Sequence, residues 1–125
     1  MATVLTDTGK AQIIAAINSD SFTSPTYVGW GTGAGTAGES DTTLFTEASE
    51  SRVSGTKSKE TTNVSNDTYQ VVATITAGGT KTITNAGLFD AATTGNLFVK
   101  GDFSGIALSN GDSIQFTIKI VQTSA

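Results

Sequence analysis

A strict alternation of apolar and polar residues in the C-terminal half constrains the fold most. Residues 113–121 and residues 69–76 both carry an apolar side chain at every second position. A period of two places one set of side chains on one face of an extended strand, whereas a helix repeats every 3.6 residues. Two half-buried strands are therefore predicted. Their apolar faces consist of Ile114, Phe116, Ile118 and Ile120, and of Tyr69, Val71, Ala73 and Ile75.

Two further strands are predicted between these, over residues 82–89 and 97–103. The apolar phase shifts within the first of them, which predicts a bulge at Ala86-Gly87. Residues 104–109 are expected to form a loop. Turn residues separate the strands, since glycine and asparagine tolerate positive φ. The turns are expected at Gly78-Gly79, Thr93 to Asn96 and Asn110-Gly111.

The N-terminal half gives weaker patterns. Residues 26–31 combine β-branched and aromatic residues and predict a strand, and the glycine-rich residues 32–38 predict a loop. Residues 41–48 are expected to form a helical turn capped by Asp41 that packs Leu44 and Phe45. Residues 52–64 are polar on both faces and suit an exposed edge strand whose lysines discourage unwanted pairing.

One segment has the pattern of a helix. Residues 6–8 offer hydroxyl and carboxylate groups that can cap a first turn. Residues 10–17, which follow Gly9, contain neither glycine nor proline. Ile13, Ile14 and Ile17 recur at the spacing of one helical face. We expect a short helix that docks on a sheet or on a neighbouring subunit.

Closely spaced strands with glycine turns and no intervening helices predict an all-β fold. The expected architecture is an antiparallel β-sandwich, jelly-roll-like, with a short N-terminal helix or arm. Residues 1–20 are assigned to this arm or helix and residues 21–125 to a single β-sandwich domain. Its core is built from small side chains, which favours additional burial between subunits.

The composition excludes most catalytic chemistry. The chain contains no histidine and no cysteine, so nucleophilic triads and thiolate metal sites cannot form. Asp90, Asp102 and Asp112 are the candidates for a pair of acid and base carboxylates, but their neighbouring glycines indicate turn capping instead. No calcium-loop motif occurs. The chain is not expected to be an enzyme, and no catalytic, cofactor-binding or metal site is predicted.

Two other motifs allow a binding function. Residues 33–38 match G-x-G-x-x-G, but no apolar helix follows, so a flexible loop is favoured over a nucleotide site. Trp30 lies between two glycines and is interpreted as a core residue. The alternative is an exposed ring that stacks on a carbohydrate.

Charge and hydropathy indicate which partners to exclude. The formal net charge is −4, which disfavours direct binding to nucleic acid. No run of eighteen apolar residues and no basic leader followed by an apolar stretch occurs, so a soluble chain without a membrane partner is expected.

Several blocks of the sequence resemble small structural proteins of tailed bacteriophages. The similarity covers roughly residues 26 to 121 and consists of turn and strand patterns. One segment, Ala86 to Asp90, also resembles segments of phage tail-fibre modules. The blocks are residues 30–33, 37–44, 84–90, 95–98 and 111–117.

The resemblance implies a capsid cement or decoration protein, without catalytic residues. Such a protein binds between major capsid proteins as a homotrimer on the outer surface of the virion and stabilises the head. Under this hypothesis Ala2 to Ile17 acts as an arm that contacts a neighbour. One alternative is a tail, baseplate or fibre component. Another is a carbohydrate-binding β-sandwich module, which predicts an exposed Trp30 beside Tyr27.

Overall fold

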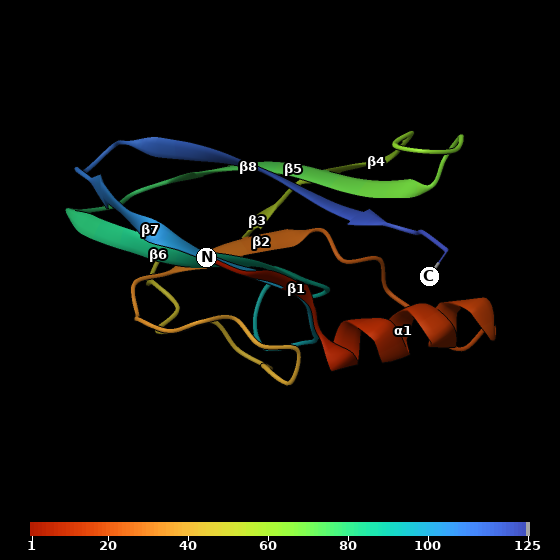
Figure 1. Ribbon diagram of the computed structural model, residues 1–125. Helices are drawn as coiled ribbons and strands as arrows, with labels where there is room; N and C mark the ends of the chain where they lie inside the picture. Colours follow the sequence, from red (N-terminus) through yellow and green to blue (C-terminus); the bar gives the residue numbers. More distant parts are fainter. Residues whose placement is uncertain (125) are drawn as a thin grey trace.

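The computed structural model describes residues 1–124 and contains two antiparallel sheets and one helix (Figure 1). The prediction of an all-β sandwich with a short N-terminal helix is confirmed. The five-stranded sheet has the order β1 (Thr3–Leu5), β7 (Leu97–Leu108), β6 (Lys81–Phe89), β2 (Tyr27–Gly31) and β3 (Val53–Ser54). The three-stranded sheet has the order β4 (Thr56–Glu60), β5 (Thr68–Thr76) and β8 (Ser113–Val121).

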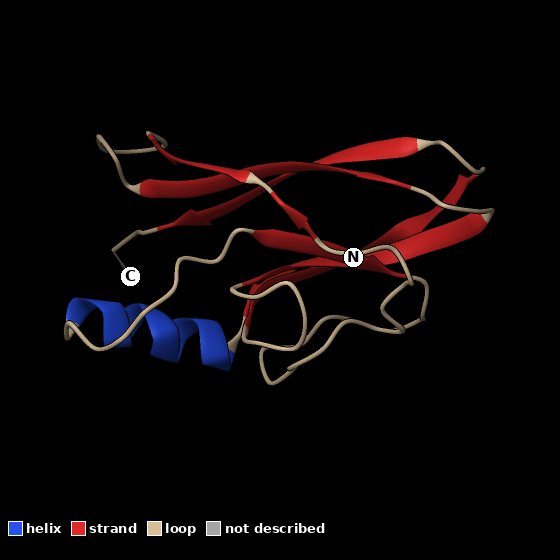
Figure 2. Ribbon diagram, turned by 180° about the vertical axis from the view of Figure 1, so that it is seen from behind, coloured by secondary structure: helices blue, strands red, loops and turns tan. Residues whose placement is uncertain are grey.

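The molecule has three layers. The three-stranded sheet covers one face of the five-stranded sheet, and the loop of residues 32–47 and helix α1 (Asp7–Ile17) lie against the other face (Figures 1 and 2). The main core fills the space between the two sheets. Its largest fully buried side chains include Trp30, Ile75, Ile83, Leu88 and Phe98.

The alternating patterns that predict the C-terminal strands are confirmed. β5 and β8 pair over nine residues each, from Thr68 opposite Val121 to Thr76 opposite Ser113. Val71 and Ile75 are buried. The apolar side chains of β8 face the same core but remain half-buried.

The β6–β7 hairpin differs from its prediction in two respects. The register shifts between Ile83 and Asn85 and again between Leu88 and Phe89, so the bulge expected at Ala86-Gly87 is wrong. The first shift leaves Thr84 without a partner on β7, and its hydroxyl donates to the carbonyl of Gly33. The loop expected over residues 104–109 is also wrong, because β7 continues to Leu108.

The segment from Asp41 to Ala48 is not a helical turn, contrary to the prediction. It is an irregular loop, although Leu44 is buried as expected. The side chain of Asn85 accepts a hydrogen bond from the amide of Phe45 and donates one to its carbonyl, both at 3.0 Å. Because these backbone groups are bonded to Asn85, they cannot take part in a helical turn.

The N-terminal helix forms where it is predicted, but its expected apolar face is wrong. Thr6 caps it by accepting from the amide of Gly9 at 2.9 Å. Ile14 and Ile17 are 63% and 75% exposed. The helix instead approaches β7 at Gly9, where an added Cβ would lie 2.7 Å from the carbonyl oxygen of Phe98. β1, which precedes the helix, pairs with β7.

Candidate functional site

A buried ion pair holds the 32–47 loop on the outer face of the five-stranded sheet. Lys100 is 1% exposed, and its Nζ lies 2.9 Å from the carboxylate of Asp41 and 2.8 Å from the carbonyl oxygen of Thr43. The ammonium also lies 3.2 Å from the centre of the Phe45 ring. Hydrogen bonds from the Gly38 amide and from Lys100 lower the pKa of Asp41. This ion pair ties the loop to β7.

Asp102 holds two separate segments beside that ion pair. Its carboxylate accepts from the amide of Ala37 at 2.8 Å and from that of Ala2 at 2.6 Å. These two hydrogen bonds lower its pKa. Asp102 was expected to cap a turn, and that prediction is wrong, because the residue lies in mid-strand and joins the N-terminal segment to the loop.

The other two candidate carboxylates cap turns, as predicted. Asp90 accepts from the amide of Asn96 at 2.8 Å and from its side chain at 2.9 Å. Asp112 accepts from the amide of Ser109 at 2.8 Å. Each of the three aspartates is thus engaged by a different part of the chain, and no hydrogen bond links any two of them in residues 1–124.

Trp30 is 1% exposed, so its interpretation as a core residue is confirmed. Its ring packs edge to face with Phe116, and its Nε1 donates to Glu50 at 2.9 Å. Glu50 also accepts from Lys81 and from the amide of Gly78. Burial alone would raise the pKa of Glu50, but these hydrogen bonds outweigh it and lower the pKa to about 2. Glu50 is therefore ionised and fully engaged.

The glycine-rich loop wraps one aromatic ring. The amide of Gly33 donates to the carbonyl of Phe45 at 2.9 Å, and a Cβ on Gly33 would lie 2.9 Å from the carbonyl carbon of Phe45. No helix follows the loop, so the arrangement that holds a pyrophosphate is not formed. Close packing accounts for Gly33 against the Phe45 backbone and for Gly35, where an added Cβ would lie 2.7 Å from the Phe45 ring.

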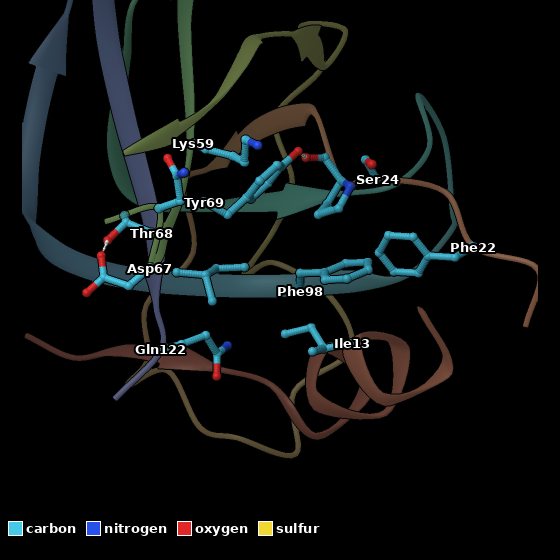
Figure 3. A pocket seen from close by; sticks show the side chains of 12 residues that line it. Ile13, Phe22, Ser24, Lys59, Asp67, Thr68, Tyr69, Phe98 and Gln122 are labelled. Atoms are coloured by element: carbon cyan, nitrogen blue, oxygen red, sulfur yellow. Dashed lines mark hydrogen bonds between the residues drawn. The ribbon is translucent and has the colours of Figure 1, made fainter. Parts of the chain in front are cut away.

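A pocket of about 290 Å³ opens between α1 and the end of the sandwich where β5 begins and β8 ends (Figure 3). The side chains drawn there come from the helix, the segment before β2, all three strands of the three-stranded sheet with their adjoining loops, and β7. Most of its wall is apolar. The apolar lining residues are Ile13, Phe22, Pro25, Tyr69, Phe98 and Ile120.

Two polar side chains of this pocket, Tyr69 and Asp67, form hydrogen bonds within the chain. The hydroxyl of Tyr69 donates to the carbonyl of Pro25 at 2.6 Å, and burial raises the pKa of Tyr69. Asp67 accepts from the amides of Val64 and Thr62, which lowers its pKa. The exposed side chain of Lys59 also lines the pocket. The apolar wall can accommodate an apolar group.

Residues 1–124 contain no cluster of three or more groups suited to hold a metal ion. No helix among them is long and apolar enough to cross a membrane. Every buried side-chain polar atom described has a hydrogen-bond partner. The polar interior is therefore fully paired.

Sequence reasoning missed the burial of Lys100 and the hydrogen bonds that Glu50 accepts from Trp30, Gly78 and Lys81. Lys100 lies within the strand predicted over residues 97–103, but the sequence analysis assigned it no role. The signal would have been a strand with apolar residues on both faces, which indicates burial on both sides and leaves Lys100 as the lone charged residue among Leu97, Phe98 and Val99.

Comparison with known families matches residues 5–124 to the family described as podophage GP4 fiber I protein gp80. The match spans nearly the whole chain. The chain belongs to this family. No curated protein and no solved structure matched it. Membership of the gp80 family identifies the chain as a structural protein of a tailed phage, in agreement with the coarser part of the resemblance.

The sequence block from Thr84 to Asp90, on which the resemblance partly rested, has structural roles throughout. Asn85 binds the backbone of Phe45, Leu88 and Phe89 are buried, and Asp90 caps the following turn. None of these side chains is left free to bind a ligand. In this gp80 family member the block serves the fold.

Proposed function

We propose that this chain is a non-catalytic structural subunit of a phage fibre. The observation that carries the proposal is the family match over residues 5–124 to a fibre protein. The paired polar interior supports it, because ion pairs such as Lys100 with Asp41 tie loops to the sandwich and no buried side-chain polar atom in residues 1–124 lacks a hydrogen-bond partner. A rigid, inert domain suits a part that works by position in an assembly.

The fibre role is favoured over the capsid-cement role expected from the resemblance. The printed family name refers to a fibre, and nothing in the structure singles out a surface for the major capsid protein. We therefore propose a virion location in the fibre instead of the outer capsid surface. The carbohydrate-binding alternative required an exposed Trp30, which is buried.

Gold-labelled antibodies against this chain, applied to intact virions, would test the location. Label concentrated on the fibres supports the proposal, and label spread evenly over the capsid faces contradicts it. The capsid-cement role has its own test. Expanded capsids with and without the protein should show equal thermal stability if the fibre proposal holds, and stabilised capsids would contradict it.

A further inference from the structure

One long side of the three-stranded sheet is unpaired. β8 pairs with β5 along its nine residues, and no strand within residues 1–124 pairs with its other side. The amide of Gln122 donates to the carbonyl of Asp67 at 3.0 Å, and the amide of Ala77 donates to that of Asp112 at 2.7 Å. Because backbone groups alternate in direction along a strand, the even-numbered residues of β8 bond to β5. The backbone groups that point outward belong to Ser113, Gln115, Thr117, Lys119 and Val121.

The apolar side chains of this edge are incompletely covered. The even-numbered residues of β8 face the core, and all four are only half-buried. A groove of about 190 Å³ lies beside them, between Phe116 to Lys119 and the other sheet at Thr3, Gly101 and Phe103. The edge thus combines free backbone donors and acceptors with a row of apolar side chains that further burial would stabilise.

The opposite edge of the same sheet is protected. Lys57 and Lys59 of β4 lie opposite Val71 and Tyr69 of β5, so they project on the core-facing side of the sheet, and both are exposed. A strand added beside β4 would have to desolvate two ammonium groups. β8 carries one charged side chain, Lys119, on its solvent-facing side.

We propose that β8 pairs antiparallel with β8 of a second copy of this chain, centred on Thr117, to give a continuous six-stranded sheet. In this register outward-pointing residues meet one another along the whole strand, which allows about ten hydrogen bonds. Phe116 lies opposite Ile118 and Ile114 opposite Ile120, so the apolar rows join.

Charge selects this register. When Thr117 is at the centre, Lys119 lies opposite the neutral Gln115 of the second copy. A register centred on Lys119 would place two ammonium groups directly opposite each other, which is unfavourable. The centred register also pairs the full length of both strands, whereas any shift leaves outward groups unbonded at the ends.

The contact does not depend on where the protein sits in the virion, so it stands or fails separately from the fibre role. The homotrimer predicted from the resemblance would need a different surface, because this contact has two-fold symmetry and uses the same strand of both copies.

A single cysteine tests the contact. The chain contains none. In the proposed register the Cα atoms of the two Thr117 residues lie about 5.5 Å apart, within the range that a disulfide spans. Thr117→Cys should therefore give a disulfide-linked dimer on mild oxidation. The matched variant Lys57→Cys, on the protected edge, should stay monomeric on a denaturing gel. Equal cross-linking of both variants, or of neither, would overturn the proposal.

Charge substitutions at Gln115 test the register. Gln115→Glu places a carboxylate opposite Lys119 of the second copy twice per dimer and should tighten dimerisation about fourfold, whereas Gln115→Lys should weaken it about as much. Thr56→Glu adds the same charge on the solvent-facing side of β4 and should leave dimerisation unchanged. Sedimentation equilibrium measures all three. A wild-type protein that is monomeric at every concentration, or a trimer insensitive to Gln115, contradicts the proposal.

Discussion

The two edges of the three-stranded sheet show how a few side chains decide whether a strand can be extended. β4 and β8 flank the same central strand, and both look polar from the solvent-facing side. They differ on the core-facing side, where β4 carries Lys57 and Lys59 and β8 carries isoleucines and Phe116. Polar composition alone therefore does not protect an edge. The position of the charge relative to the core does.

Removing the protection of β4 should have the largest effect. Lys57→Ile combined with Lys59→Ile gives β4 an apolar core-facing row, so dimers formed through β8 can join through β4 into extended ribbons. Light scattering should show particles that grow with concentration. Replacing both lysines by arginine is the control and should keep the wild-type size. An isoleucine variant that also keeps that size would contradict the role given to the lysines.

Disrupting the interior should destabilise the fold without changing either edge. Glu50→Gln leaves the half-buried Lys81 ammonium without its carboxylate and should lower the free energy of unfolding by about 2–3 kcal/mol. Urea denaturation measures this loss. Glu39→Gln removes an exposed ion pair with Lys10 and should leave unfolding unchanged within error. If Glu50→Gln lowers the free energy of unfolding by less than about 1 kcal/mol, the hydrogen bonds of Glu50 do not stabilise the sandwich as proposed.

Transferring the β4 pattern to β8 should abolish pairing at a smaller cost in stability. Ile118→Lys introduces a core-facing lysine at a half-buried position and should lower the free energy of unfolding by about 1–2 kcal/mol. The variant should sediment as a monomer. Ser113→Lys adds the same charge on the solvent-facing side, opposite the neutral Val121, and should remain dimeric. If Ile118→Lys also stays dimeric, β8 does not form the contact.

Acid should act on the fold before it acts on the β8 contact. The pKa of Glu50 is about 2 in the folded chain, below its ordinary value of 4.5, so the folded state favours the ionised form. The stability contributed by Glu50 is complete above pH 4.5 and is lost as the pH falls towards 2. Urea midpoints should decrease over that interval.

The β8 contact should be insensitive to pH by comparison, because Lys119 is the only titratable side chain on the strand. Dimer affinity should stay constant between about pH 5 and 9. Sedimentation at several pH values checks this. A steep change in affinity within that range would indicate that other titratable groups form the contact.

The strands of the three-stranded sheet could be predicted because their alternation is local. Ile114 to Ile120 and Val71 to Ile75 reveal their buried face within a few residues, and the Asn110-Gly111 turn separates β7 from β8. The flanking glycines indicated that Trp30 is a core residue. The polar residues 52–64 indicated an edge strand, which the structure contains as β4.

The outer layer could not be predicted, because long-range contacts create it. Lys100 is buried because the loop that contains Asp41, Thr43 and Phe45 packs over β7. Thr43, whose carbonyl accepts from Lys100, is 57 positions away in the sequence. The loop conformation depends on Asn85, and the contact of the helix depends on Gly9 fitting against Phe98. Local propensity for a helical turn at Asp41 and for an isoleucine-rich helix face is overridden by these contacts.

Hydrogen exchange at the two edges tests the account most directly. At high protein concentration the outward amides of Thr117 and Lys119 in β8 should exchange slowly, and dilution should accelerate them. The outward amides of Lys57 and Lys59 in β4 should exchange rapidly at every concentration. Equally rapid exchange at both edges, independent of concentration, would contradict the claim that β8 joins copies of the chain while β4 is protected.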